Sequence, residues 1–227
     1  MIKDSLRKVP LFKNLSNDVL KDIASVAKER IYKKGNIIIS EGNKSNDIYI
    51  IKEGKVKVYK TSSTGKNVIL DIKGSGSVLA GTTLFSDSLN PATIMTIEDS
   101  LVYTLKNSDL ENLIRNNSDL ALDFIKILSN ELHNSQEKIT NIALNDTYVR
   151  VAKLLLTLSS KHGIDSNDDN TLKLDLNLTR EELASLIGTS RETISRALSQ
   201  FSKENIIDIK GREIIICNKN KLEEWLK

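Results

Sequence analysis

Residues 179–204, which decide the fold, read Thr-Arg-Glu-Glu-Leu-Ala-Ser-Leu-Ile-Gly-Thr-Ser-Arg-Glu-Thr-Ile-Ser-Arg-Ala-Leu-Ser-Gln-Phe-Ser-Lys-Glu. Thr179 and Glu182, three residues apart, form a capping box in which the hydroxyl and the carboxylate each accept from an orphan backbone N–H. Gly188 follows an apolar run and can adopt the left-handed conformation that ends a helix, and Ser190 can cap the next one. The stretch therefore predicts two capped helices joined by a tight turn, a helix-turn-helix.

The second helix of this pair has an apolar face and a polar face. Ile194, Leu198 and Phe201 recur at i, i+4 and i+7, so they share one core-facing stripe. The opposite face holds Arg191, Glu192, Ser195, Arg196 and Gln200. In a helix-turn-helix this face enters the major groove, where Arg donates two hydrogen bonds to guanine and Glu accepts from cytosine. An ordinary solvated helix face is the alternative, but the two caps, the glycine turn and a following hairpin favour DNA.

That hairpin is predicted from two β-rich runs, residues 206–209 and 213–216, which flank Lys210, Gly211 and Arg212. Its position after the second helix is typical of the wing of a winged helix. Lys210 and Arg212 at its tip are suited to contact phosphates, which position a protein on the duplex without reading base sequence.

The segment 188–201 closely resembles the recognition helix of the Crp/Fnr family of bacterial transcription regulators, and the resemblance extends over nearly the whole chain. In the cyclic-AMP receptor branch of that family, the base-reading residues match Arg191, Glu192 and Arg196. In the oxygen-sensing Fnr branch they match Glu192, Ser195 and Arg196. This sequence satisfies both patterns.

The resemblance implies a two-fold palindrome with half-sites near TGTGA or TTGAT, and the presence of Arg191 favours TGTGA. The expected partner is double-stranded DNA. The expected DNA-binding residues combine the two helix starts, the base readers and the wing tip: Thr179, Ser190, Arg191, Glu192, Ser195, Arg196, Lys210 and Arg212.

Length and charge limit the remaining interpretations. The chain has 227 residues, enough for one large or two ordinary domains, and a formal net charge of +3. From Asp146 to Lys227 there are 13 Lys and Arg against 13 Asp and Glu, so DNA affinity has to come from a local basic surface. The sequence has no apolar run approaching the ~20 residues of a membrane span and no secretory signal, so we expect a cytoplasmic protein without a membrane partner.

The few residues able to bind metals or cofactors are scattered. Cys217 is the one cysteine, which excludes an intrachain disulfide and a four-cysteine iron–sulfur site, and we interpret it as inert packing in an apolar wing strand. His133 and His162 are the two histidines, and neither lies in the predicted barrel, so a cupin-type metal enzyme and a haem site lack ligands. The acidic segment 162–170 lacks EF-hand spacing and is interpreted as a flexible surface loop. We expect no cofactor, no metal and no catalytic site.

Residues 30–106 have a different character, with short β-branched runs and seven of the ten glycines (35, 42, 54, 65, 74, 76 and 81). This pattern is typical of an antiparallel barrel or jelly roll. The clearest predicted strands are residues 37–39, 48–51, 55–58, 68–70 and 92–95.

The barrel resembles the cyclic-nucleotide-binding domain but departs from it at the phosphate cassette. That family holds the ribose with a Glu and neutralises the phosphate with an Arg-Ser pair, and alignment puts Gly81, Asn90 and Pro91 at those three positions. Residues 77–105 contain no Lys or Arg, and burying an unpaired anion is costly. We therefore expect an effector other than cyclic AMP, neutral or weakly polar, or a vestigial pocket.

A long amphipathic stretch separates the barrel from the helix-turn-helix. Its apolar positions recur at threes and fours: Leu120, Phe124, Ile127, Leu128, Leu132, Ile139, Ile142 and Ala143. The resemblance implies a helix that pairs with its twin in a dimer, whereas packing on its own barrel is the alternative. Ser135 and Gln136 interrupt the stripe where the family's helix touches the effector. The expected effector-contacting residues are Gly81, Thr82, Thr83, Leu84, Asn90, Ser135 and Gln136, although Thr82 and Thr83 equally suit plain strand or turn positions.

Together these features predict an α+β protein with a jelly-roll effector domain (1–106), a long dimerisation helix and hinge (107–145) and a winged helix-turn-helix (146–227). The predicted function is a homodimeric transcription regulator gated by a small molecule other than cyclic AMP, with RNA polymerase as a further expected contact. The alternative is a constitutive DNA-binding protein whose barrel is a ligand-free scaffold or a protein-interaction platform. A ligand-dependent change in DNA affinity would separate the two.

Overall fold

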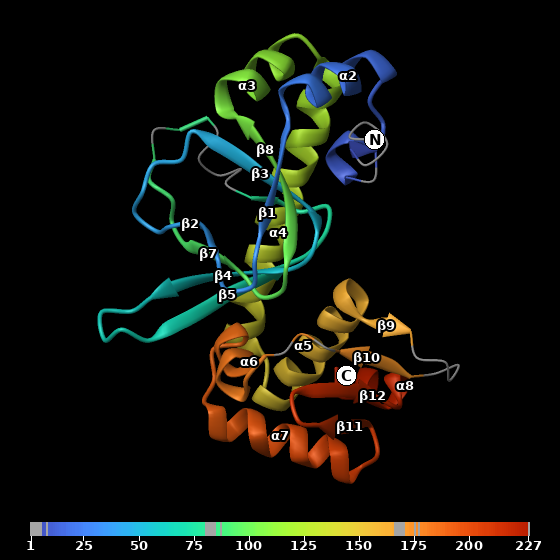
Figure 1. Cartoon of the computed structure of the whole chain (residues 1–227). Coiled ribbons are helices and arrows are strands. Elements are labelled where there is room, and N and C mark those ends of the chain that lie inside the picture. Colours follow the sequence, from blue (N-terminus) through green and yellow to red (C-terminus); the bar gives the residue numbers. More distant parts are fainter. Residues whose placement is uncertain are drawn as a thin grey trace. The chain divides into compact units, whose positions relative to one another are not determined.

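The computed structural model describes residues 6–7, 9–79, 85–86, 88–165, 171–174, 176 and 178–226. The chain folds as two compact units, Met1–Asn134 and Ser135–Lys227, and each is described by itself below (Figure 1). The first unit is mainly β-sheet and the second mainly helical, with a small sheet of its own. The α+β fold class expected from the sequence is confirmed.

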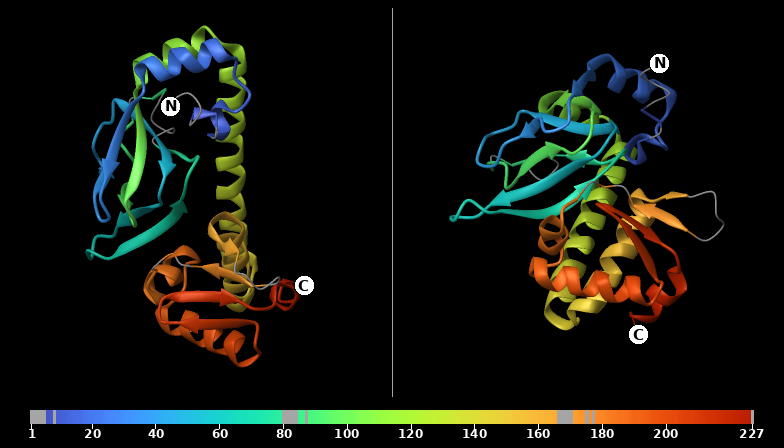
Figure 2. Two further views of the ribbon diagram at one scale, coloured as in Figure 1. Left: turned by 45° about the vertical axis from the view of Figure 1, so that its right-hand side comes forward. Right: turned by 60° about the horizontal axis from the view of Figure 1, so that its bottom comes forward.

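The first unit contains two four-stranded antiparallel sheets, in the orders β1-β8-β3-β6 and β2-β7-β4-β5. The strands are β1 (Lys28–Tyr32), β2 (Ile37–Ile39), β3 (Asp47–Glu53), β4 (Val56–Thr61), β5 (Asn67–Lys73), β6 (Val78–Leu79), β7 (Thr93–Thr96) and β8 (Ser100–Lys106). The strands expected from the sequence are present, and β1, β6 and β8 complete the sheet that contains β3. Figure 2 shows the strands folded around one another beside the helices of this unit.

Residues 48–51 of strand β3 are apolar without interruption because both faces of the strand are buried. Ile48 and Ile50 belong to one buried cluster, whereas Tyr49 and Ile51 belong to another, because successive side chains of a strand point to opposite faces. The first cluster lies under the helical elements η1 (Pro10–Phe12), α2 (Asn17–Val26) and α3 (Asn107–Arg115), together with the start of α4. The second cluster fills the space between the two sheets.

Helix α4 (Ser118–Leu144) has 27 residues, about 40 Å at 1.5 Å per residue. The single apolar stripe expected from the sequence divides into two parts. Leu120 and Phe124 are buried in the core of the first unit and Ile127 packs against that core, whereas Leu132 and Ile139 are exposed. The near end of the helix therefore packs on its own barrel, and its far end has apolar side chains that the described residues leave exposed.

The second unit combines helices α5 (Thr147–His162), α6 (Arg180–Leu186), α7 (Arg191–Lys203) and α8 (Lys219–Glu224) with a four-stranded sheet of order β11-β12-β10-β9. The expected hairpin is present as β11 (Ile207–Lys210) and β12 (Glu213–Ile216).

Strands β9 (Ile164–Asp165) and β10 (Leu172–Leu174) are an addition to the expected fold. They correct part of the interpretation of residues 162–170 as a loop, because Ile164 and Asp165 pair with Lys173 and Leu172. Residues 166–170 lie outside the described part of the chain.

Gly54 provides a test of the barrel. Its φ of +99° lies in the left-handed region, and an added Cβ would lie 2.7 Å from the Cα of Ser100. We expect Gly54→Ala to lower the free energy of unfolding of the first unit by about 3 kcal/mol, because backbone strain and overpacking add. Urea denaturation followed by circular dichroism measures the change.

The matched control is Gly65→Ala, because Gly65 has a similar φ of +79° but no atom within 4 Å of an added Cβ. Only the conformational cost of about 1 kcal/mol applies there. Equal effects of the two substitutions would show that the contact with Ser100 does not constrain the barrel.

Candidate DNA interface

Helix α6 begins with the capping box expected from the sequence. Thr179 Oγ1 accepts a hydrogen bond from the backbone N–H of Glu182 at 3.1 Å, and Glu182 Oε2 accepts from the backbone N–H of Thr179 at 2.9 Å. Two of the unpaired donors at the helix start are satisfied in this way. Leu183 and Ala184 of the same helix are buried, which anchors it to the core of the second unit.

The turn between α6 and α7 is closed by backbone hydrogen bonds. The N–H of Thr189 donates to the carbonyl of Ala184 at 3.0 Å, and the N–H of Gly188 donates to that of Ser185 at 3.2 Å. This is the Schellman arrangement, which requires a left-handed residue, and Gly188 supplies it with φ of +63°. Ser190 then caps α7 by accepting from the N–H of Thr193 at 3.2 Å. The predicted helix-turn-helix is confirmed in its caps and in its turn.

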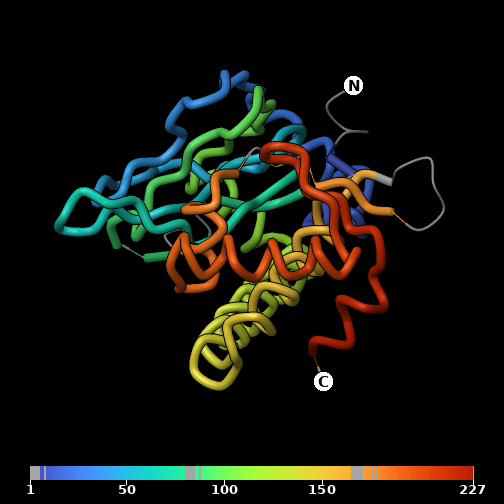
Figure 3. The backbone as a smooth tube through the Cα atoms, turned by 90° about the horizontal axis from the view of Figure 1, so that it is seen from below, coloured from blue at the N-terminus to red at the C-terminus, as the bar shows by residue number. Residues whose placement is uncertain are grey.

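Helix α7 has the two faces expected from the sequence. Ile194, Leu198 and Phe201 are at most 1% exposed. On the other side Arg191, Glu192, Arg196 and Gln200 are exposed, and Ser195 is half-buried. Figure 3 shows α7 as a straight helix beside the β11–β12 hairpin. The charged side chains expected to read bases are thus free to meet a partner along one side of the helix.

Glu192 is held in its ionised form. A hydrogen bond from its own backbone N–H, and then one from the Ser190 hydroxyl, lower the pKa of the Glu192 carboxyl below its ordinary value. The charges of Arg191 and Arg196 act in the same direction. The side chain is therefore an acceptor throughout the physiological pH range, which suits the exocyclic amine of cytosine.

The wing hairpin ends in a two-residue turn. Lys210 pairs with Glu213, and Gly211 between them has φ of +66°. The Lys210 side chain is 68% exposed, and its Nζ lies 3.9 Å from Asp208 Oδ2. Arg212 is exposed at the turn itself. Both cations expected at the tip are accessible, with the charge of Lys210 partly offset by Asp208.

The His, Cys, Asp and Glu side chains of the described residues do not form a metal site. In the described ranges, no three His, Cys, Asp or Glu residues are grouped as metal ligands would be. Within those same ranges, no helix combines the length and apolar character needed to cross a membrane. Cys217 is a half-exposed free thiol that directly follows β12 and lies outside that strand, which corrects its expected position, and its Sγ donates to the carbonyl of Ile215 at 3.8 Å.

The expected effector residues are placed only in part. Gly81, Thr82, Thr83 and Leu84 lie outside the described residues. Asn90 is 4% exposed, and its Nδ2 donates to the carbonyl of Asn43 at 2.7 Å, so its amide braces the neighbouring loop. Ser135 and Gln136 are exposed on α4.

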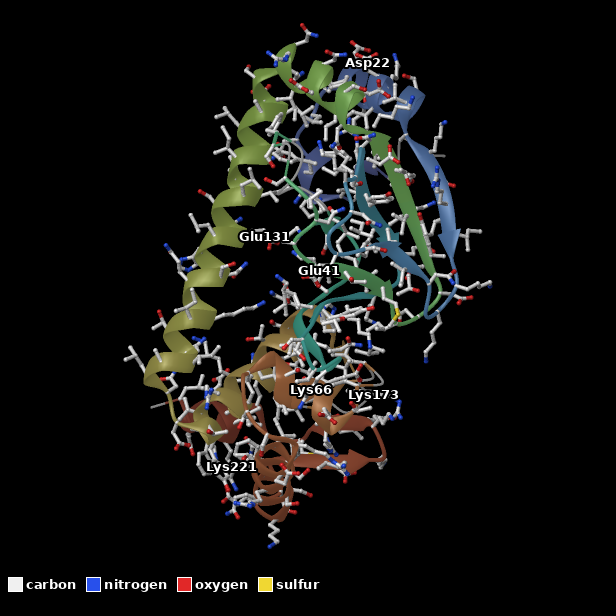
Figure 4. The ribbon with its side chains drawn as sticks, turned by 90° about the vertical axis from the view of Figure 1, so that its left-hand side faces the viewer. Asp22, Glu41, Lys66, Glu131, Lys173 and Lys221 are labelled. Carbon is white, nitrogen blue, oxygen red and sulfur yellow. The ribbon has the colours of Figure 1, made fainter. Side chains whose placement is uncertain are left out.

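Lys73 is a cation that sequence reasoning missed, because the search for a countercharge covered only residues 77–105. Its Nζ lies 2.6 Å from Glu131 Oε1 on α4 and 3.9 Å from Asp71 Oδ2, and its side chain is 17% exposed. Figure 4 shows Glu131 on the side of α4 that faces the strands. The signal available in the sequence was that Lys73 closely follows the predicted strand 68–70. Its charge is already compensated within the first unit.

Most of the exposed large apolar residues of α4 follow a heptad spacing. Five of them, Ile125, Leu128, Leu132, Ile139 and Ile142, have this spacing, with exposed fractions of 59%, 36%, 61%, 68% and 53%, and are called the apolar seam below, whereas the exposed Leu122 and Leu144 lie off it. Ser135 occupies the remaining position of the same pattern. A repeat of this kind is the pattern by which two helices pack as a coiled coil.

Comparison with known proteins identifies both units. A model of the cyclic nucleotide-binding domain matches residues 29–117, and a model of the Crp-like helix-turn-helix domain matches residues 149–225. The CRP-like cAMP-activated global transcriptional regulator of Mycobacterium tuberculosis is 26% identical over 191 residues, which cover 84% of each chain.

Two further proteins agree with these matches. The anaerobic regulatory protein of Bacillus subtilis is 26% identical over 208 residues, which cover 90% of this chain and 86% of that protein. The structure of FixK2 from Bradyrhizobium japonicum superimposes with a TM-score of 0.75 at 24% identity, covering 88% of this chain and 97% of that one. The last likeness concerns the fold.

Proposed function

The chain belongs to the Crp/Fnr family of DNA-binding, non-enzymatic transcription regulators, and we propose that it binds a palindromic operator as a homodimer gated by a small molecule other than cyclic AMP. The observation that carries this proposal is the exposed face of α7, where Arg191, Glu192 and Arg196 stand opposite a fully buried apolar stripe. RNA polymerase is the further partner that we propose for such a regulator.

The proposed half-site is TGTGA, with TTGAT as the alternative. Arg191 and Arg196 carry guanidinium donors suited to the O6 and N7 of guanine, and the ionised Glu192 is suited to accept from cytosine. We assign Lys210 and Arg212 to phosphates, because they lie at the tip of the wing and not on α7. Thr179 and Ser190 hold the starts of the two helices, where their backbone also adjoins the expected duplex.

The apolar seam of α4 supports the homodimer. Five large apolar side chains at heptad positions are left exposed, and a second copy of the helix would cover them. A two-fold axis along this seam would also present two recognition helices to successive turns of a palindrome, about 34 Å apart. We propose a hinge at residues 145–147, where α4 has ended and α5 begins, and its movement would have to open the hydrogen bond from Lys153 to Asn141 of α4.

The proposal excludes cyclic AMP on grounds of charge. Gly81, Asn90 and Pro91 stand where the ribose-binding and phosphate-binding groups are expected, and residues 77–105 contain no Lys or Arg. Lys73 does not fill this role, because its Nζ already lies against Glu131. A neutral or weakly polar effector avoids the cost of burying an unpaired anion.

A barrel that serves only as a scaffold is the second candidate. The observation in its favour is that the buried side-chain amide of Asn90 donates to the carbonyl of Asn43, so this donor is engaged within the loop. In this alternative the unliganded dimer is already competent to bind DNA. A change in DNA affinity on adding a small molecule separates the two candidates.

The base readers and the phosphate contacts predict different effects. Arg196→Ala should cost about 1–3 kcal/mol of specific affinity and relax base choice at one half-site position. Lys210→Ala should weaken binding to every sequence alike and reduce the salt slope by about 1. Fluorescence anisotropy on a TGTGA palindrome and on scrambled DNA, at several salt concentrations, measures both effects. The same behaviour of the two variants on both DNAs would refute the assignment of readers.

The dimer is tested at the centre of the apolar seam. Leu132→Glu places two like charges against each other in the proposed coiled coil, so the protein should become monomeric at micromolar concentration. Asn130→Glu is the matched control, because Asn130 is exposed on the same helix but lies outside the heptad positions of the seam. Analytical ultracentrifugation distinguishes the states. A Leu132→Glu protein that stays dimeric would place the interface elsewhere.

Cyclic AMP at about 1 mM should leave the melting temperature unchanged, because a ligand that binds the native state alone has to raise it. Differential scanning calorimetry with and without the nucleotide measures this, with 5′-AMP as the control for nonspecific nucleotide effects. A rise of several degrees with cyclic AMP but not with 5′-AMP would overturn the charge argument.

A further inference from the structure

Arg150, in the second turn of α5, connects that helix to the helix-turn-helix. Its Nη1 donates to the backbone carbonyl of Ile187 at 2.8 Å, and its Nη2 donates to Thr147 Oγ1 at 3.0 Å. The first bond spans 37 residues of sequence, and the second fixes the guanidinium against its own helix. Arg150 is half-buried, so both bonds are partly shielded from water.

The carbonyl that Arg150 binds is one that the turn itself leaves open. The Schellman hydrogen bonds use the carbonyls of Ala184 and Ser185, whereas Ile187 is the C-cap that follows α6 and precedes the left-handed Gly188. Ile187 is also only three residues before Ser190, which caps α7. A bond that fixes Ile187 therefore fixes the point at which the recognition helix begins.

The same face of α5 is tied to the end of α4. Lys153 Nζ donates to Asn141 Oδ1 at 2.9 Å, and Asn145 Nδ2 donates to the same oxygen at 2.9 Å. Ile142 lies beside the turn, with its Cδ1 3.7 Å from the position of a Cβ added at Gly188. Within the second unit, α5 thus joins the last turns of α4 to the turn that precedes α7.

Stability alone does not account for an arginine at this place. Its Nε is buried and has no hydrogen-bond partner among the described residues. A buried donor left unpaired is unfavourable, and an apolar side chain of similar volume would avoid that cost. The two hydrogen bonds that Arg150 does make fix the position of Ile187 relative to α5.

We propose that Arg150 is a positioning residue for DNA recognition, one that touches no base and no phosphate but holds the α6–α7 turn so that Arg191, Glu192 and Arg196 enter the groove in register. This inference rests on the proposed specific DNA binding and deepens it. A guanidinium is suited to the task, because its planar donors bind two acceptors in a fixed orientation.

The test compares three variants of the full chain on a TGTGA palindrome and on scrambled DNA over a range of salt. Arg150→Met should lose about ten-fold in specific affinity, the scale of one hydrogen bond to a charged group, with unchanged binding to scrambled DNA and an unchanged salt slope. Arg150→Lys keeps a donor for Ile187 and should recover most of the loss. Lys161→Met, which removes an exposed cation from the same helix, should behave as the wild type.

Amide hydrogen exchange of the free protein supplies a readout that does not depend on the operator. The N–H groups of Gly188 and Thr189 should exchange about ten-fold faster in Arg150→Met and regain protection in Arg150→Lys. Unchanged exchange would overturn the inference even if the wild type failed to discriminate the palindrome, a result that by itself would count against the proposed operator.

Two further outcomes would also refute a positioning role. If Arg150→Met lost equal affinity on both DNAs and its salt slope fell by about 1, Arg150 would be a phosphate contact. If Arg150→Lys failed to recover specific affinity while both variants lost melting temperature equally, the residue would serve folding alone.

Discussion

The helix-turn-helix of this protein depends on the backbone conformation of one residue, Gly188. Its positive φ lets the amides of Gly188 and Thr189 turn back onto the carbonyls of Ser185 and Ala184, so two of the carbonyls at the end of α6 are paired by the turn itself. Ser190 can then cap α7 only two residues later. A residue with a Cβ would be strained at this φ, and the angle between the two helices would have to change. The charged residues Arg191, Glu192 and Arg196 lie on the exposed face of the helix that begins after this turn.

Helix α4 satisfies two demands with two faces. Leu120, Phe124 and Ile127 lie on the side that packs into the first unit, and Glu131 continues that side to its ion pair with Lys73. The apolar seam lies on a different side and follows a heptad spacing. A helix of 3.6 residues per turn can separate the two stripes because the seam positions follow the core-side positions by one residue, a little over a quarter of a turn. One element thereby packs on its own barrel and keeps an exposed apolar seam, which the proposed homodimer requires.

The barrel combines the architecture of a cyclic nucleotide-binding domain with a stretch, residues 77–105, that contains no Lys or Arg. A bound anion would find no Lys or Arg in residues 77–105, and the charge of the nearby Lys73 is compensated by Glu131. The sheet topology of a domain does not determine its charges, so the architecture alone does not identify the ligand. The family membership describes the fold and the DNA-binding class, and the side chains of this chain limit the chemistry of an effector.

The sequence by itself determined whatever depends on neighbouring residues: the capping box of Thr179 and Glu182, the cap at Ser190, the glycine turn, the apolar stripe of α7 and the wing hairpin. Each of these is set by spacings of a few residues, which periodicity and turn chemistry reveal. Only the tertiary structure decided which distant groups meet. Lys73 pairs with Glu131 across 58 residues, and Arg150 bonds Ile187 across 37. β10 pairs with β12, and β9 pairs with β10, although both strands are too short to be recognised from their own sequence. Such contacts have no local signature, because they depend on how elements pack and not on the order of residues within them.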